Sequence, residues 1–328
     1  MASRSGHPRA GVDYPGTWSA FLEWFPDDAA CAAYLELLRW PEGFWCPHCG
    51  SGQGWRISDG RFSCAGCARK VSVTAGTIFH GTRTPLRTWF AAAWYLTNQK
   101  HGASALGLQG VLGLGSYRTA WTMLHKYRTA MVRPDRDLLS GDVEVDETYL
   151  GTEAGVAGRH IETKCIVVIA VEVHSPKGFG RIRLRRVDDL TADSLVGFIT
   201  DVVESGAVII TDGWNSYRPL PRHGYVHKRT SIRAGNDPAH VVQPGVHRVA
   251  SLLKRWLLGT HQGAVRPEHL DAYLNEFTFR FNRRSSRQRG MLFYRLLEQA
   301  VVTNPAPYKQ IIGGGLNLPL TTQSDGLY

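Results

Sequence analysis

The spacing of hydrophobic residues changes along the chain, and the change separates a mainly helical first part from a later part that is rich in strands. Before residue 133, outside one cysteine-bearing segment, apolar residues recur every three or four positions, as on the buried face of a helix. Between residues 142 and 229, they alternate with polar residues or form short continuous runs, as in strands. The pattern predicts an α/β protein in which helices precede a sheet.

The helices predicted in the first part cover residues 20–25, 29–40, 86–99, 102–111 and 117–131. The first two follow Thr17 or Ser19 and Asp27 or Asp28, and the last follows Ser116; these residue types cap helix N-termini. We therefore expect these caps to fix where the helices begin.

The last two of these helices are joined by a glycine-bearing turn at residues 113–116, which matches the spacing of a helix-turn-helix. The second helix would expose polar and basic side chains to DNA phosphates and base edges. These are Arg118, Thr119, Thr122, His125, Lys126 and Arg128. An ordinary helical hairpin with a solvated charged face is the alternative.

The strands predicted in the later part cover residues 142–151, 164–174, 181–187, 207–211 and 225–229. A helix capped by Thr191 and running through Glu204 separates the third strand from the fourth, and a helix over 245–258 follows the last. This order is that of a ribonuclease H-like fold with a mixed five-stranded sheet. In that fold the first and fourth strands lie side by side at the centre of the sheet.

The first predicted strand carries acidic residues where a strand normally carries apolar or neutral ones. Asp142, Glu144 and Asp146 would share one face, opposite Val143 and Val145. Either a divalent cation, which binds carboxylate oxygens, offsets their repulsion, or the strand is a sheet edge whose acids face water.

A second acid, Asp212, follows the fourth predicted strand. If the fold is ribonuclease H-like, Asp212 meets Asp146 across a gap small enough for Mg²⁺ or Mn²⁺; read alone, Asp212 would close an Asx turn. Glu147, beside Asp146, and Glu144 are secondary candidates. Aromatic residues after Asp212, Trp214 and Tyr217, either stack on an unpaired base or pack in the core.

The predicted helix over 245–258 contains no acid. One of its faces instead carries His247, Ala250, Ser251 and Lys254, which are spaced at i, i+3, i+4 and i+7. His247 is a candidate metal ligand through a neutral ring nitrogen, and Lys254 a candidate phosphate contact; a structural histidine is the alternative.

Four cysteines form two C-x2-C pairs, Cys46 with Cys49 and Cys64 with Cys67. A hairpin that turns at residues 59–60 is predicted between the pairs. Four thiolates at this spacing are typical of a structural Zn²⁺ site, the zinc ribbon, which leaves no open position for catalysis. Two disulfides are the alternative. The ribbon either binds DNA or stabilises the neighbouring parts of the protein.

Composition and charge favour a nucleic-acid partner. The 328 residues carry a formal net charge of +10 with a pI near 9.5, which suits a polyanion. No apolar run approaches the ~20 residues that span a bilayer, and the start of the chain lacks the apolar core of a signal peptide. We therefore expect no membrane association and a cytoplasmic, nucleoid-associated protein.

Taken together, these motifs resemble the DDE-type transposases of bacterial insertion sequences, in the group with an amino-terminal zinc ribbon and an ISXO-like transposase domain. The similarity extends in order and spacing from about residue 17 to about residue 297. Its matching stretches are the two C-x2-C pairs, Thr119-Ala120-Trp121, Val143–Gly151, Thr211–Tyr217, residues 259–273, Glu276-Phe277 and residues 279–284.

The resemblance implies a catalytic set of two aspartates, a variable third residue and a lysine seven positions later, here Asp146, Asp212, His247 and Lys254. Many relatives carry Glu or Asn at the third position, so His247 would be either a ligand of the catalytic Mg²⁺ or Mn²⁺ or a general base. The implied activity is cleavage of double-stranded DNA at terminal inverted repeats and strand transfer into target DNA, by a homo-oligomer. Arginines in the last matching stretch and shortly after it would bind the DNA backbone or form a solvated helix end; they are Arg280, Arg283, Arg284, Arg287 and Arg289.

The expected domains are a lead-in (1–16), amino-terminal helices (17–40), a zinc ribbon (41–82), a helix-turn-helix region (83–133), a ribonuclease H-like catalytic domain (138–300) and a tail (301–328). Two other functions fit the same motifs. One is a DNA-binding regulator with an inactive catalytic sheet, and the other is a metal-dependent nuclease that does not transpose.

Overall fold

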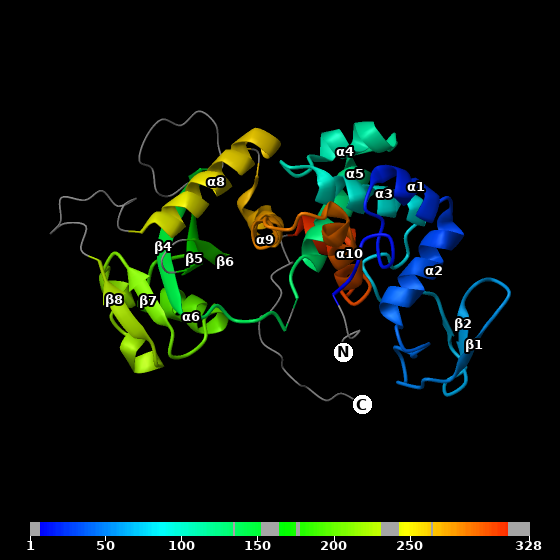
Figure 1. Cartoon of the computed structure of the whole chain (residues 1–328), viewed down its shortest axis with the longest axis horizontal. Helices are drawn as coiled ribbons and strands as arrows, with labels where there is room; N and C mark the ends of the chain where they lie inside the picture. The colour runs from blue at the N-terminus through cyan, green and yellow to red at the C-terminus, as the bar shows by residue number, and fades with distance from the viewer. Residues whose placement is uncertain are drawn as a thin grey trace. The chain divides into compact units, whose positions relative to one another are not determined.

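The computed structural model describes residues 7–133, 135–151, 164–174, 178–230, 243–263 and 265–313. By its internal contacts the chain divides into two compact units (Figure 1). Unit 1 comprises Met1–Arg133 and Ser285–Ile311, and unit 2 comprises Pro134–Arg284 and Ile312–Tyr328. The chain therefore leaves unit 1 for the sheet of unit 2 and returns to unit 1 near its end.

Unit 1 contains the predicted helices, and their caps are confirmed. Thr17 accepts the Ala20 N–H at the start of the first helix, and Asp27 accepts the Ala30 N–H at the start of the second. Ser116 caps the fifth in the same way, through the Thr119 N–H. The helices are α1 (Trp18–Trp24), α2 (Asp28–Arg39), α3 (Leu86–Asn98), α4 (Ala105–Leu112), α5 (Tyr117–Ala130), α10 (Arg289–Ala300) and the short α11 (Tyr308–Ile312).

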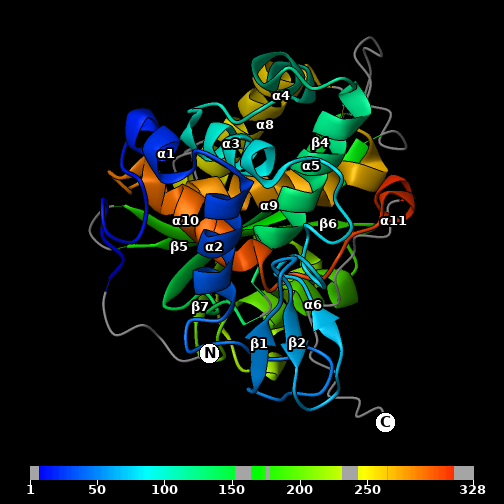
Figure 2. The same cartoon turned by 90° about the vertical axis from the view of Figure 1, so that its right-hand side faces the viewer.

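The core of unit 1 is aromatic and depends on α10, which arrives from the far end of the sequence. Phe293 of α10 makes edge contacts with Phe21, Phe90 and Trp94, at ring-centroid distances of 5.7, 5.9 and 5.4 Å. Helix α10 packs against α2, α3 and α5 (Figure 2). These contacts explain why residues 285–311 belong with the amino-terminal helices.

The cysteine-bearing segment forms the predicted hairpin. Strands β1 (Gly54–Arg56), β2 (Phe62–Cys64) and β3 (Lys70–Val71) pair antiparallel. Gly60 has a φ of 82°, which a glycine adopts without strain at the turn between β1 and β2. Phe44 and Phe62 stack 4.8 Å apart beside Trp40, so the ribbon has a small aromatic core of its own.

Unit 2 is built on a mixed five-stranded sheet of order β6-β5-β4-β7-β8. Strands β4, β5 and β6 are antiparallel neighbours, while β7 lies parallel to both β4 and β8. The predicted adjacency of the first and fourth strands of this sheet is confirmed, because β4 pairs with β7. The strands are β4 (Asp142–Gly151), β5 (Lys164–Val173), β6 (Phe179–Val187), β7 (Val208–Thr211) and β8 (Val226–Arg229).

Helices cover both faces of this sheet. On one face, Val143 and Val145 of β4 pack in a core with α6 (Ala192–Val202). On the other, Val167 and Ile169 of β5 pack with α8 (Pro244–His261) and α9 (Leu270–Phe281). The acid-bearing strand is thus central, and the alternative of a solvent-exposed edge strand is wrong. Short 3-10 turns complete the unit at Asn215–Tyr217, Leu220–His223 and Pro267–His269.

None of the helices within the described ranges combines the length and the apolar character that crossing a membrane requires.

Candidate functional site

The parallel pairing of β4 with β7 brings the two predicted aspartates toward each other. The pairs run from Asp142 with Val208 to Glu144 with Ile210, and extending this register by two residues sets Asp146 opposite Asp212. Asp212 directly follows the last residue of β7, so it stands at the carboxyl end of a buried strand. This is the edge at which α/β sheets hold their functional side chains.

The acidic side chains at this edge perturb one another. Burial first, and then the charges of Glu147, Asp212 and Glu144, raise the pKa of Asp146 to about 7. The Glu147 N–H, which donates to Asp146 Oδ1 at 2.9 Å, opposes this shift. Burial and Asp212 likewise raise the pKa of Glu147, whose Oε2 accepts the Tyr217 hydroxyl at 3.2 Å. A cation among these carboxylates would relieve their repulsion.

A cavity of about 460 Å³ opens between β4 and α8. It is lined by Asp146, Glu147, Thr148, Ile169, Val246, His247, Ala250, Ser251 and Lys254. The structure thus places Asp146, His247 and Lys254 around one cavity, and the helical face predicted at i, i+3, i+4 and i+7 is the face that lines it. Asp212 does not line the cavity, but its charge acts on Asp146 and Glu147.

The position of the Glu144 carboxylate was not predicted from the sequence. Its side chain is only 3 % exposed, and its Oε2 accepts the Val246 N–H at 3.0 Å. Burial raises the pKa of Glu144, and hydrogen bonds from the Val246 and Gly245 amides oppose that shift. The expectation of acids on an open sheet face fails here because α8 covers that face. The sequence at the start of α8, Pro244-Gly245-Val246, offers no capping side chain. That lack of a local cap was the sequence feature from which an acceptor elsewhere in the fold could have been predicted.

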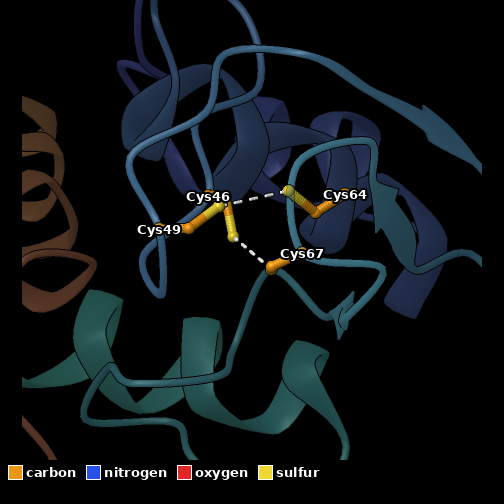
Figure 3. Close-up of side chains that lie close together, drawn as sticks. All are labelled: Cys46, Cys49, Cys64 and Cys67. Atoms are coloured by element: carbon orange, nitrogen blue, oxygen red, sulfur yellow. Dashed lines mark hydrogen bonds between the residues drawn. The ribbon is translucent and has the colours of Figure 1, made fainter.

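The four predicted zinc ligands converge in unit 1 (Figure 3). Their Sγ atoms all lie within 4.8 Å of one another, with 3.8 Å between Cys46 and Cys67 and 3.5 Å between Cys49 and Cys64. Burial by itself raises the pKa of the Cys64 thiol, but hydrogen bonds, those of the Cys67 and Gly66 backbone amides among them, lower it to about 6. All six cysteines are free thiols, so the disulfide alternative is wrong. The cluster has the donor set of a structural zinc site.

Among the described residues, these cysteines are the one group of three or more Cys, His, Asp or Glu ligand atoms gathered so closely. The carboxylates around Asp146 therefore lie further apart than the thiolates do. Of these carboxylates, Asp146 and Glu147 line the cavity, whereas Asp212 and Glu144 lie outside its lining.

Helix α5 does not expose the side chains expected of a recognition helix. His125 and Arg128 are 0 % and 1 % exposed, and Lys126 donates its Nζ proton to the Ile78 carbonyl at 3.2 Å. The prediction that these residues face solvent is wrong, because α3, α4 and α10 pack around the helix. Thr122 is half-buried and donates to the Arg118 carbonyl at 2.7 Å, which leaves Arg118 as the exposed cation of the set.

The carboxyl-terminal arginines make close contacts within unit 2. Arg280 pairs with the buried Glu276 at 2.9 Å, and Arg283 lies 4.0 Å from the ring centroid of Phe279. Arg284 donates to the Gly180 carbonyl of β6 at 3.1 Å. These arginines therefore have structural contacts at the end of α9, and Arg284 links that end to the edge strand β6.

Other exposed groups lie on α8 and after β7. Arg248, Lys254 and Arg255 are exposed on α8, a helix of 18 residues that contains no acidic side chain. Trp214 is 52 % exposed, whereas Tyr217 is fully buried. Of the two predicted stacking residues, only Trp214 is therefore open to a ligand.

Comparison with known proteins adds family information to this geometry. Residues 138–282 match the family described as ISXO2-like transposase domain, and residues 26–70 match the family described as transposase zinc-ribbon domain. Over 282 residues, the chain is 26% identical to a Halobacterium salinarum protein named "Uncharacterized protein in transposable element ISH50". That match covers 79% of this chain and 92% of the relative. The resemblance found in the sequence motifs is confirmed.

Proposed function

We propose that this chain, which matches a transposase zinc-ribbon domain and an ISXO2-like transposase domain, is a transposase that binds the terminal inverted repeats of its element and catalyses metal-dependent DNA cleavage and strand transfer. One observation carries the proposal. Asp146, within β4, lies opposite Asp212, which follows the parallel strand β7, and Asp146 lines a cavity together with His247 and Lys254 of α8.

The sheet domain is proposed to be ribonuclease H-like. The support is its topology, with three antiparallel strands, a helix, and a fourth strand that returns parallel to the first at the sheet centre. Helices α6 and α8 on opposite faces agree with this assignment.

Asp146 and Asp212 would hold Mg²⁺ or Mn²⁺, with His247 as the third ligand. The donor set fits: carboxylate oxygens suit these ions, and the pKa of Asp146 is raised first by burial and then by the negative charges of Glu147, Asp212 and Glu144, which a cation would offset. When bound, such ions stabilise negative charge on the attacking and leaving oxygens of an in-line displacement.

The remaining chemistry belongs to side chains of the cavity. Lys254 would contact a phosphate oxygen of the strand being cut and hold it in line. If His247 is not a ligand, its neutral imidazole would take the proton of the attacking water or 3′-hydroxyl. Tyr217 fixes the Glu147 carboxylate beside Asp146 through its hydroxyl.

DNA would approach along α8. The exposed Arg248 and Arg255 flank the cavity, and no acid on the helix offsets their charge. Arg118 and the zinc ribbon would add contacts to terminal-repeat DNA from unit 1, with Trp214 available to stack on an unpaired base. Two ends must be joined to one target, so we propose that the protein acts on DNA as a homo-oligomer.

The test is a cleavage assay on labelled terminal-repeat DNA with Mg²⁺ or Mn²⁺. Asp146→Asn and Asp212→Asn should abolish cleavage and leave DNA binding intact, while Asp142→Asn, on the same strand but outside the cavity lining, should cleave normally. Binding by the wild type without cleavage in either metal would identify a regulator. Cleavage without joining of 3′ ends to target would identify a nuclease.

A further inference from the structure

Helix α8 starts without a capping side chain of its own. Its N-cap residue, Gln243, makes no side-chain cap hydrogen bond, and Pro244 occupies the first turn. The free N–H groups of a first turn need acceptors, and negative charge is favoured there by the helix dipole. Glu144 of β4 supplies both an acceptor and a carboxylate at this position, because its Oε2 accepts the Val246 N–H at 3.0 Å.

A second tether comes from the other aspartate-bearing strand. Gln243 is 1 % exposed, and its Nε2 donates to the Ile210 carbonyl of β7 at 3.1 Å. Glu144 and Ile210 are direct partners in the β4–β7 pairing. The start of α8 is therefore held by both strands at one level of the sheet. That level lies two residues before Asp146 on β4 and two before Asp212 on β7.

We propose that Glu144 and Gln243 are positioning residues, a two-point clamp that fixes the register of α8 so that His247 and Lys254 line the cavity together with Asp146. The inference rests on the proposed function, since the clamp acts through His247 and Lys254. His247 directly follows the clamped Val246, and its N–H bonds to the Gln243 carbonyl at 3.4 Å. A slip of one residue would move each side chain by about 1.5 Å along the helix and about 100° around it, out of the cavity.

Gly245 supports the clamp independently of the hydrogen bonds. A Cβ on Gly245 would lie 2.8 Å from Glu144 Oε2 and 3.1 Å from the nearest ring carbon of Phe179. Only a residue without a side chain lets the carboxylate lie so close to the first turn. The glycine is thus a part of the contact rather than a source of flexibility.

The experiment compares Glu144→Gln with Glu144→Met in the full-length protein. Both side chains nearly match glutamate in size, but only glutamine keeps an oxygen that accepts the Val246 N–H. Since a misplacement of about 1 Å costs on the order of 10²-fold in rate, we expect Glu144→Met to lower kcat for end cleavage by about that factor. DNA affinity without metal should change less than about twofold, and Glu144→Gln should recover most of the rate.

Two further readouts separate positioning from stability. In a background that lacks both side chains through which the clamp acts, His247→Ala with Lys254→Ala, Glu144→Met should add little further loss of rate, because residues that act as a unit are not additive. The matched control is Glu172→Met. Glu172 is also a buried glutamate of this sheet, but it pairs with Arg181, and its loss should lower stability without this coupling to His247.

Hydrogen exchange at the Val246 amide reports the clamp directly, with or without activity. We expect protection in the wild type and Glu144→Gln, and its loss in Glu144→Met. The proposal is overturned if Glu144→Met keeps that protection, if it cleaves at the wild-type rate, or if it loses as much rate in the His247→Ala, Lys254→Ala background as it does alone. The proposed function fails separately. It is refuted if hydrogen exchange behaves as expected but the wild type never cleaves DNA, or if Asp146→Asn still cleaves. The catalytic role of the clamp is then refuted as well.

Discussion

Replacing Asp146 by asparagine should stabilise the metal-free protein while abolishing cleavage. The substitution removes a carboxylate that burial and the charges of Glu147 and Asp212 disfavour, and it keeps an oxygen to accept the Glu147 N–H. Since the pKa of Asp146 is raised from 3.8 to about 7, the cost of ionising it in the folded protein is at most about 4 kcal/mol at about 1.4 kcal/mol per pH unit. The buried asparagine keeps part of the desolvation cost, so we expect a gain of about 2 kcal/mol.

The sign of the pH dependence follows from the raised pKa. Below about pH 4 the carboxyl is protonated in both the folded and unfolded states, and the variant has no advantage. Between about pH 4 and pH 7 the folded wild type keeps its proton while the unfolded chain loses it, so the penalty on the wild type grows. Above pH 7 the difference stays constant.

The assay is thermal unfolding of wild type and Asp146→Asn at pH 5 and pH 8. Buffers are cleared of divalent ions by a resin, so that no chelator strips zinc from the ribbon. A gain of about 2 kcal/mol corresponds to an increase of about 4–8 °C in Tm at pH 8, and to less at pH 5. Added Mn²⁺ should stabilise the wild type alone, by about 2.7 kcal/mol at a hundredfold excess over Kd. Equal Tm values at pH 8, with Asp142→Asn as control, would refute the reasoning.

Three further predictions concern other parts of the protein. Cys64→Ser should release the bound zinc and unfold the ribbon, which metal analysis and circular dichroism would register; a full zinc content would contradict it. Arg248→Gln combined with Arg255→Gln should flatten the plot of log K against log salt by about 2, at about 0.9 per lost phosphate contact, and an unchanged slope would exclude these contacts. Tyr217→Phe removes the hydroxyl that lowers the pKa of Glu147, so that pKa rises and the pH–rate profile should move to higher pH; a profile that stays in place would show that Glu147 does not limit the rate.

Local structure was predictable because its causes are local. Thr17, Asp27 and Ser116 cap the helices that they precede in the sequence, since an N-cap bonds within one turn of its own position. The turn signal at residues 59–60 likewise predicted the hairpin, and the spacing of the four cysteines predicted their cluster. The order of strands predicted that β4 and β7 are neighbours, which aligned Asp146 with Asp212.

Exposure was not predictable in the same way. The spacing of side chains along α5 shows which of them share a face, but not what covers that face. His125 and Arg128 are buried because α3, α4 and α10 pack around α5, and α10 begins more than 150 residues later in the sequence. The arginines around the end of α9 were expected to bind DNA or to face solvent. Instead, Arg280 within α9 and Arg283 just after it lie against Glu276 and Phe279 of that helix.

The sequence alone determined which elements form and which residues carry candidate chemistry, because capping, periodicity and ligand spacing act over a few residues. Only the tertiary structure decided how those elements are held together. Glu144 has the sequence context of a surface acid on a strand, and it becomes the cap of α8 only when that helix covers its face of the sheet. That contact joins residues 102 positions apart, and no local pattern specifies it.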